Sequence, residues 1–371
     1  MIFLQNNSPT ESFRLTFPAF RCVLAALLLT CSSFVASSPL ARAQAAPPTK
    51  FPVSIVLPPK LVAGQPGTLA VLDADGRLAP DVTVELGPEQ NTNQAKLQRV
   101  TTDITGRAFF TAPSQGGVIF ARVLGVTSVG IVESASSLAK QGIAVRPFIS
   151  QRDPFLICGV AFRGDADANS VRLNDESGLI LAASPQCLVV LAGPKAKPGL
   201  TQIVVDAGPV HATAFATMVS LDSGPANPPL APGKKSVMTV RVEGSDKALA
   251  IVVENKTPGV LRFLRGDAQQ LRTTGGSVNR AQIEVEALRS GDFSFHARLA
   301  SVPDADAARR YLEAALPLAP KDSQSTIKKL ADRLTHHQSD IEKVRRELDK
   351  ILSSAIAGDS RALLEAARAS L

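Results

Sequence analysis

The fold of this chain is decided by short alternating runs such as residues 53–57 (VSIVL), 83–86 (TVEL) and 203–205 (IVV). In such a run the side chains point alternately to the two faces of a β-strand, so one face enters a core and the other meets water. From Phe51 to about Pro303 the runs recur at intervals of about 8–12 residues, with Gly, Pro, Asp and Asn between them. This pattern predicts antiparallel β-sandwiches rather than alternating strands and helices.

Two stretches of small or turn-forming residues divide the strand-rich region. Residues 133–142 are rich in Ser and Ala, and residues 222–232 are rich in Pro. A Pro-rich linker is a fairly stiff spacer. We therefore expect three sandwiches, at residues 50–132, 143–219 and 220–301, which these two linkers join.

The N-terminus, residues 1–45, has the three parts of a cleavable export signal. Arg14 and Arg21 precede an apolar run at residues 22–29, and small residues follow, with cleavage patterns at 41–43 (ARA) and 43–45 (AQA). The run is shorter than the roughly 20 residues that a membrane-spanning helix needs. We expect an exported protein that is periplasmic, on the cell surface or secreted, with no transmembrane span in the mature chain. Lipidation at Cys31, within LLTC at residues 28–31, is the alternative.

The charge of the chain argues against nucleic acid as a partner. Loss of three Arg and one Glu with the signal lowers the formal net charge from +7 to +5. The excess is spread along the chain, without a Lys/Arg cluster, and the chain has no Trp and one Tyr. Nucleic-acid binding usually needs a concentrated basic face with stacking aromatic residues.

The first segment contains three distinctive stretches, residues 62–66 (VAGQP), 72–77 (LDADGR) and 101–108 (TTDITGRA). In these stretches it resembles a bacterial immunoglobulin-like domain of the invasin/intimin type. The resemblance implies that the last two stretches are turns in which Gly supplies a positive φ.

The second segment contains five further stretches, residues 157–159 (ICG), 162–164 (FRG), 169–173 (NSVRL), 183–185 (ASP) and 188–190 (LVV). In these it resembles an IPT/TIG domain, which is also immunoglobulin-like. Both resemblances imply modules for display, spacing or protein contact, and neither brings catalytic residues. The third segment is assigned as a sandwich on its pattern alone.

Two of the four cysteines lie in the expected signal, which leaves Cys158 and Cys187 in the exported chain. An even pair in an oxidising compartment suggests a disulfide, worth about 3 kcal/mol by loop closure. The alternative is two thiols that pack separately as small hydrophobes. The IPT/TIG resemblance turns Ile157 inward and Cys158 outward, and places Cys187 on a neighbouring strand of the same sheet.

The C-terminal segment, residues 304–371, has a helical pattern. Asp304 can cap a helix through Tyr311 and Leu316 that ends at Pro317 and Pro320. A longer helix is expected from about 325 to 357, with Gly358 ending it and Asp359 or Ser360 capping a last helix through Leu364. The expected packing seam of the long helix has a 3–4 spacing, broken by His337, and consists of Ile327, Leu330, Leu334, His337, Ile341, Val344, Leu348 and Ile351.

This seam leaves two alternatives open. It can close an intramolecular helical hairpin or three-helix cluster, or it can form an intermolecular coiled coil that makes a homo-oligomer.

No motif for catalysis or cofactor binding emerges from the sequence. There is no G-x-S-x-G elbow, no phosphate-binding loop, and no histidine pair with zinc spacing. Residues 165–169 (DADAN) carry alternating oxygen ligands, but the glycine of an EF-hand is replaced by Ser170, so they are read as a polar turn. Residues 73–76 (DADG) are likewise read as a hairpin turn. We expect no cofactor, no metal site and no catalytic residues.

These patterns predict a non-catalytic exported protein of the cell envelope that presents or spaces a surface for an unidentified protein partner, in adhesion or another protein–protein interaction. One alternative is an accessory or carbohydrate-binding module of an extracellular enzyme system, although the lack of Trp and the single Tyr count against it. Another is an oligomeric envelope scaffold assembled through the C-terminal helix.

Overall fold

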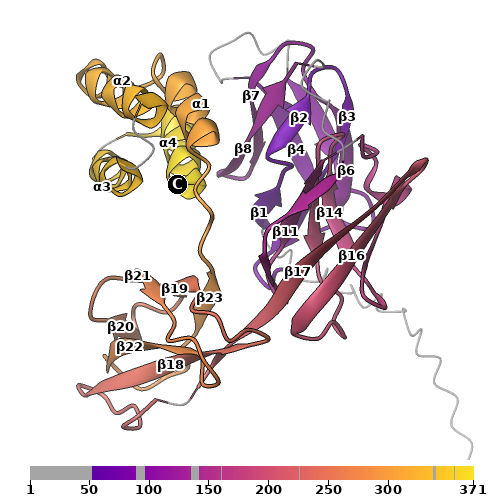
Figure 1. Ribbon diagram of the computed structural model, residues 1–371. Helices are drawn as coiled ribbons and strands as arrows, with labels where there is room; N and C mark the ends of the chain where they lie inside the picture. The colour runs from indigo at the N-terminus through magenta and orange to yellow at the C-terminus, as the bar shows by residue number, and fades with distance from the viewer. Residues whose placement is uncertain are drawn as a thin grey trace, which may run out of the picture. The chain divides into compact units, whose positions relative to one another are not determined.

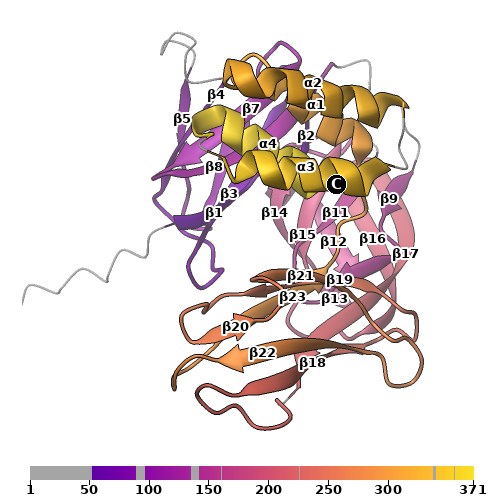
Figure 2. The ribbon, with the colours of Figure 1, turned by 90° about the vertical axis from the view of Figure 1, so that its left-hand side faces the viewer.

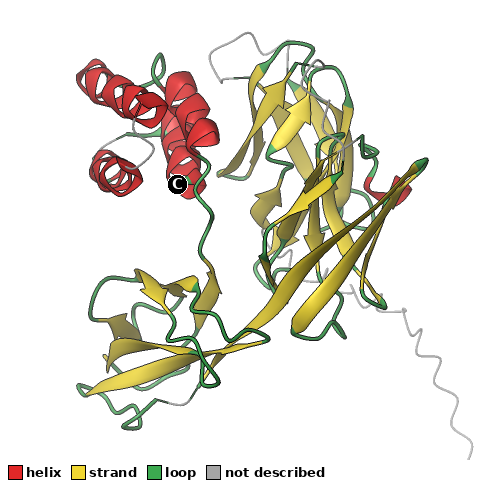
Figure 3. Ribbon diagram, viewed as in Figure 1, coloured by secondary structure: helices red, strands yellow, loops and turns green. Residues whose placement is uncertain are grey.

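The computed structural model describes residues 52–88, 97–134, 142–159, 161–224, 226–336, 340–354 and 356–371. The expected signal peptide lies outside these residues. Residues 50–371 form one compact unit. Along the chain, the strands β1–β23 come first and the helices α1–α4 follow them (Figure 3).

The first sandwich packs two sheets around a core that includes Leu69, Val84, Phe110 and Ile119. One sheet contains β1 (Pro52–Val56), β3 (Pro66–Asp73) and β6 (Arg107–Thr111); the other has the order β2 (Lys60–Val62), β8 (Val126–Glu133), β7 (Gly117–Val123), β4 (Thr83–Gly87) and β5 (Gln98–Thr101). The short β2 runs parallel to β8, whereas the other pairs within this sandwich are antiparallel.

The two stretches that the resemblance implies to be turns are turns with a positive-φ Gly, and they share one hydrogen-bond pattern. The Asp73 carboxylate accepts from the backbone N–H groups of Asp75 and Arg77, and Gly76 has φ +73°. The Asp103 carboxylate accepts from the N–H groups two and four residues later, and the glycine there has φ +71°. Because Gly has no Cβ, it reaches this conformation without steric cost.

The second sandwich is built on a core that includes Ile157, Val171, Leu188 and Ile203. Its strands are β9 (Ile143–Val145), β10 (Phe148–Ser150), β11 (Phe155–Gly159), β12 (Ser170–Leu173), β13 (Glu176–Ser177), β14 (Leu179–Ala183), β15 (Cys187–Leu191), β16 (Gly199–Ala207) and β17 (Val210–Ser223), with the short 3-10 helix η3 (Ala166–Ala168). β9, β11, β15 and β14 form one side, and β13, β12, β16, β17 and β10 form the other.

The first two sandwiches share a continuous sheet, because Ala183 of β14 pairs with Thr68 of β3. The buried Thr68 hydroxyl donates to the Gly164 carbonyl over 2.7 Å and accepts from the N–H of Ala166. A Cβ on Gly164 would lie 2.1 Å from the carbonyl oxygen of Pro66, so only glycine allows this approach.

The third sandwich begins within β17. Ser220–Ser223 of that strand pair with β18, so one strand passes from the second sandwich into the third (Figure 1). The strands are β18 (Lys235–Glu243), β19 (Ala250–Asn255), β20 (Leu261–Phe263), β21 (Ala268–Arg272), β22 (Arg280–Ala287) and β23 (Phe295–Leu299). They form the orders β17-β18-β22-β20 and β21-β19-β23 around a third core.

The expected linker at residues 222–232 is therefore wrong. Its start lies in β17, the Gly224 N–H donates to the Thr239 carbonyl over 2.7 Å, and Asn227 pairs with Val237. The proline-rich stretch is held along β18 because its backbone groups find partners there. The other expected linker, residues 133–142, lies mostly outside the described residues.

The C-terminal helices are α1 (Ala305–Ala315), α2 (Lys321–His336), α3 (Ile341–Leu352) and α4 (Gly358–Ser370) (Figure 2). The predicted Asp304 cap is confirmed, since its carboxylate accepts from the Ala307 N–H over 2.9 Å. The single helix expected at about 325–357 is wrong, because α2 ends at His336 and α3 begins at Ile341. The described apolar residues of α2 and of α3 both pack into one core with α1 and α4.

The start of the last helix also differs from the expectation. Gly358 begins α4 rather than ending the helix before it, and Ala357 is the cap residue, without a side-chain hydrogen bond. Asp359 lies in the first turn instead, and its carboxylate pairs with Arg122 of β7 over 2.8 Å. Phe120 and Ile131 of the first sandwich belong to the same core as the helices, so the helical cluster packs on that sandwich.

Candidate functional site

A cavity of about 650 Å3 lies beside β10. Its walls come from the segment 146–156, the start of β19, the connection between β23 and α1, and α3. The apolar lining residues are Phe148, Ile149, Phe155, Leu156, Leu249, Leu299 and Val302, with several prolines and alanines. The charged ones are Arg146, Arg298, Arg345, Asp153 and Glu342.

A second cavity of about 490 Å3 adjoins the first and shares Gln270, Arg298 and Arg345 with it. One wall is the outer face of the β21-β19-β23 sheet, and the other is formed by α3 and α4. We refer to the two cavities together as the cleft. A site of this size, with mostly apolar walls and a few fixed polar groups, is typical of ligand binding.

Arg345 is the most buried of the cleft cations, with 8% of its surface exposed. One of its Nη atoms donates to Glu342 over 2.7 Å and to Gln270 of β21 over 3.0 Å, and the other contacts the Leu371 carbonyl. Its buried Nε has no hydrogen-bond partner among the described residues. Arg345 therefore links α3 to the third sandwich and retains one unused donor.

Arg146 differs from the other cations of the cleft. It is half-buried, and among the described residues no carboxylate lies within ion-pair distance of it. Burial lowers the pKa of Arg146, against the opposing charge of Asp304. An arginine remains protonated in proteins even so. It therefore presents a partly desolvated positive charge to an apolar cavity.

Arg298 projects from β23 and pairs with Glu254 of β19 over 3.1 Å. Burial acts to raise the pKa of Glu254, but the hydrogen bonds and charges of Lys256 and Arg298 outweigh it and lower that pKa. Glu254 is thus held as a carboxylate and neutralises Arg298. Among the cations of the cleft, Arg146 is therefore the one whose pairing with an anionic ligand would contribute most to the free energy of binding.

Ser150, Asp153 and His296 form a short polar chain at the edge of the cleft. The Ser150 hydroxyl donates to one Asp153 oxygen over 2.8 Å, and the other oxygen lies 2.8 Å from Nε2 of His296. The hydrogen bond that Asp153 accepts from His296 raises the pKa of His296 against partial burial. The acid stands between the hydroxyl and the imidazole, so this order does not let the histidine deprotonate the serine as a catalytic triad does.

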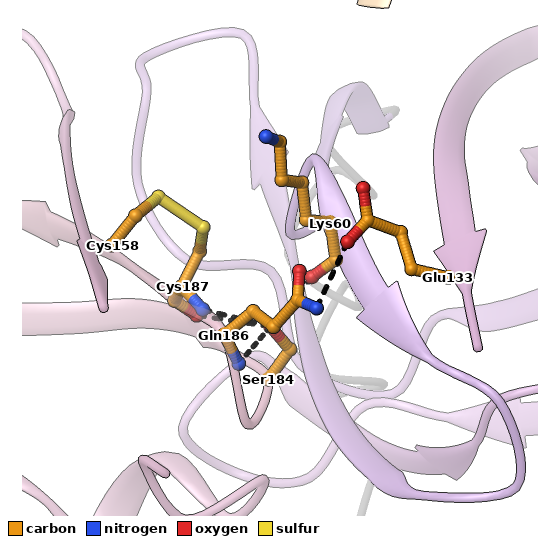
Figure 4. The surroundings of a disulfide bond; sticks show 6 residues. All are labelled: Lys60, Glu133, Cys158, Ser184, Gln186 and Cys187. Carbon is orange, nitrogen blue, oxygen red and sulfur yellow. Dashed lines mark hydrogen bonds between the residues drawn. A yellow bond between two sulfur atoms is a disulfide. The ribbon is translucent and has the colours of Figure 1, made fainter. Parts of the chain in front are cut away.

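The sulfurs of Cys158 and Cys187 are joined in the structure, with their Cα atoms 4.2 Å apart (Figure 4). The two residues face each other across the antiparallel pair β11–β15, while Ile157 is fully buried on the inner face. Next to them, Gln186 donates to Glu133 over 3.0 Å, and Glu133 also pairs with Arg310 of α1 over 3.0 Å. The disulfide thus lies beside a junction of two sandwiches and a helix.

The described residues of the expected helix-packing seam all lie in one helical core. Five of them are buried, namely Ile327, Leu330, Leu334, Val344 and Leu348, and two are partly buried, Ile341 and Ile351. His337 lies outside the described residues. α1 and α4 contact α2 and α3, so these described seam residues are covered within the chain.

The DADAN stretch forms the polar turn that the sequence predicts. Asp165 caps η3 by accepting from the Asp167 N–H, and the Asn169 amide donates to the carbonyls of Arg163 and Asp165. In the described part of the chain, no three His, Cys, Asp or Glu side chains gather in a way that could hold a metal ion. Of the histidines, His211 contacts Asp206 and His296 contacts Asp153.

Sequence reasoning missed the cleft. Arg146, Arg298 and Arg345 come from three distant parts of the chain, and no local spacing connects them. The one available signal was a charged residue, Arg146, within the otherwise apolar stretch 143–149 (IAVRPFI). Across the described residues, no helix has the length and apolarity to cross a bilayer.

No family model matches this chain, and no curated protein matches it. Among solved structures it is similar to invasin, a bacterial integrin-binding protein, at 12% identity and a TM-score of 0.19, over 67% of this chain and 57% of that one. It is also similar to SGBP-B from a xyloglucan utilization locus of Bacteroides uniformis, at 9% identity and a TM-score of 0.23, over 67% of this chain and 98% of that one. A third similarity is to the N-terminal four Ig domains of Dscam1 isoform 6.44, at 11% identity and a TM-score of 0.19, over 67% of this chain and 69% of that one.

TM-scores this low describe no common global arrangement, and the fold assignment rests on the strand pairing described above. The chain is a mainly β protein in which tandem immunoglobulin-like sandwiches precede a helical C-terminal segment. It spans 57% of the length of the invasin chain.

Proposed function

We propose that this chain is an exported, non-catalytic binding protein of the cell envelope that takes a segment of a partner protein into the cleft. The observation that carries the proposal is Arg146, a half-buried cation without an ion-pair partner among the described residues. Burying a charge is unfavourable unless it is paired, and the charge of Asp304 offsets the desolvation of this guanidinium only in part. A carboxylate of the ligand, paired with the guanidinium, would supply the remaining compensation.

The other walls define the rest of the ligand. Phe148, Leu249 and Leu299 offer apolar surface next to Arg146, so an apolar side chain near an acidic one would fill the cavity. The walls are held by shared strands: β17 crosses between two sandwiches, and Arg345 ties α3 to Gln270. A preformed site of this kind limits the conformational cost of binding.

The structure favours a protein ligand over the other functions. Tyr311, the single tyrosine, is 5% exposed in the helical core and supplies no aromatic platform for a sugar. The described residues of the helix seam are covered within the chain, which supports a function other than assembly through the C-terminal helix. For the first two sandwiches we propose the invasin/intimin type and the IPT/TIG type. The paired Asp and Gly turns at 73–77 and 103–107 support the first assignment.

Photo-crosslinking in the native host tests the site. A benzophenone amino acid replaces Val302, which lines the cavity and is 58% exposed, or Val278, which is 65% exposed in a turn outside it. We expect a discrete protein adduct from position 302 and none from position 278. Arg146→Gln should weaken the adduct about 10- to 100-fold, because a hydrogen bond to a charged group contributes about 1.5–3 kcal/mol.

Arg99→Gln is the matched control, because Arg99 has a 72% exposed side chain on the first sandwich. The proposal fails if Arg146→Gln leaves the adduct unchanged, or if both crosslinker positions capture the same proteins. Mass analysis of the protein recovered outside the cytoplasm tests export separately. Its first residue should be Gln44 or Ala46 if the signal is cleaved as the sequence predicts.

A further inference from the structure

One side of β17 is open over part of its length. Along Val210–Met218 the strand pairs with β16 (Figure 1). On its other side β10 pairs with residues 217–219. β18 pairs with Ser220–Ser223, beyond the end of the pairing with β16. Within the described ranges, no strand pairs with residues 211–215 on that side. We refer to these five residues, HATAF, as the open run.

The register of β10 shows which backbone groups the open run presents. The Thr217 N–H donates to the Pro147 carbonyl over 2.8 Å, and the Gln151 N–H donates to the Val219 carbonyl over 2.9 Å. Successive residues of a strand direct these groups to alternate sides. His211, Thr213 and Phe215 therefore point their N–H and C=O groups away from β16, toward the open edge.

The side chains of the open run fit an interface. His211, Thr213 and Phe215 lie exposed on the outer face, where Phe215 has 62% of its surface in solvent. The open run contains no Lys, Arg or Pro, which natural proteins use to protect exposed strand edges. The inward residues Ala212 and Ala214 are small. β9 contacts β17 but pairs with β11, in the opposite sheet.

We propose that a second copy of this chain pairs with the open run, antiparallel and around a two-fold axis through Thr213. The run is symmetric about that residue: Pro209, which lacks an N–H, lies four residues before it, and Thr217, whose N–H is already bonded to Pro147, lies four residues after it. The pairing places Thr213 opposite Thr213 of the second copy. It also places His211 opposite Phe215, as a cross-strand aromatic pair.

This interface is isologous, so the three donors on each copy meet the three acceptors on the other. It differs from the helix seam, whose apolar residues are covered within the chain. Five paired residues on each copy bury much less accessible surface than the roughly 1,200–2,000 Å2 that the two partners of a stable complex bury together. The dimer is therefore weak, and its population depends on protein concentration.

Sedimentation velocity of the full exported chain, from about 1 to 500 µM, should show a monomer that converts progressively to a dimer over the concentration range of weak complexes. Thr213→Cys should yield a disulfide-linked dimer under mild oxidation. Residues that exchange both hydrogen bonds have Cα atoms about 5.5 Å apart, within the range that a disulfide spans. Ile104→Cys, at a site that is 91% exposed in the first sandwich, is the control and should stay monomeric.

Two further variants test the interface without a new thiol. Thr213→Lys and Phe215→Lys should each weaken dimerisation at least tenfold. Neither residue's N–H is bonded within the chain on that edge, so the far-UV spectrum and thermal midpoint should stay the same. Leu200→Lys, at a site 75% exposed on the neighbouring β16, should leave the dimer unchanged.

A chain that stays monomeric at every concentration, or a Thr213→Cys variant that crosslinks no better than Ile104→Cys, overturns the proposal. So does a dimer that both lysine variants leave intact. If instead an extended peptide with the sequence of the open run binds the monomer while two whole chains do not associate, the edge serves strand addition by a different partner, and the self-pairing is wrong.

Discussion

Replacing Arg122 by Met tests how the helical cluster is held on the first sandwich. The Arg122 guanidinium lies 2.8 Å from the Asp359 carboxylate, in the first turn of α4, and the two side chains are only 11% and 9% exposed. The guanidinium also lies 4.6 Å from the centre of the Phe120 ring. Methionine keeps an unbranched apolar side chain at this position and removes the charge.

The expected loss in unfolding free energy is about 3 kcal/mol. Removing one partner of a buried ion pair costs about 3–5 kcal/mol, because the remaining charge stays desolvated. The lower end of this range applies here, because each of the two side chains still has about a tenth of its surface exposed to solvent. Asp359→Leu should also destabilise the protein. The double variant should lose at least about 1 kcal/mol less than the sum of the two single losses, because it leaves no isolated charge.

Urea unfolding followed by tyrosine fluorescence is the assay. The chain has one Tyr and no Trp. Tyr311 is 5% exposed and lies in the same helical core as Phe120. The signal therefore reports on the cluster that Asp359 belongs to. A loss below about 1 kcal/mol for Arg122→Met, or additive losses in the double variant, would show that the ion pair does not hold the cluster in place.

Three further outcomes follow from single contacts. Burial raises the pKa of Tyr311 from 10.0 to about 12, so the folded state favours the neutral phenol. That contribution to stability is complete below pH 10 and is lost between pH 10 and about 12, which an ultraviolet absorbance titration of folded and urea-unfolded protein should show. Cys158 and Cys187 close a loop across a sequence separation of 29 residues. Reduction of their disulfide should therefore lower the unfolding free energy by about 3–4 kcal/mol in urea titrations. Alkylation of the unreduced, denatured protein should add no mass. Gly164→Ala would put a Cβ 2.1 Å from the Pro66 carbonyl oxygen, so it should cost about 1–3 kcal/mol by the same titration, and an unchanged midpoint would show that the junction can relax.

Local patterns in the sequence were enough for much of the fold. The alternating runs became strands, the two turns with Asp and Gly formed as predicted, and Asp304 caps α1. These features depend on residues a few positions apart, so the chain encodes them without reference to the rest of the molecule. The division into domains at 132–143 and 219–220 stays a prediction, since shared sheets join the sandwiches.

The helix over 325–357 shows where periodicity misleads. A 3–4 spacing of apolar residues is the same whether a helix continues or folds back on itself. The difference is decided by what covers the stripe, and here α1 and α4 cover it from within the chain. The linker at 222–232 was wrong for a related reason, because proline content does not show that the stretch folds back along the next strand, β18, and finds hydrogen-bond partners there.

Local sequence patterns specify the strands, the two turns with Asp and Gly, the cap of α1 and the pair of cysteines outside the expected signal. Long-range packing sets the pairing of Ala183 with Thr68, the passage of β17 through two sandwiches, and the meeting of Arg146, Arg298 and Arg345 in one cleft. The physical reason is that strand register and helix docking bring together residues far apart in the chain. Their contact energies depend on the whole packed arrangement, and the neighbours of each residue in the sequence do not encode them.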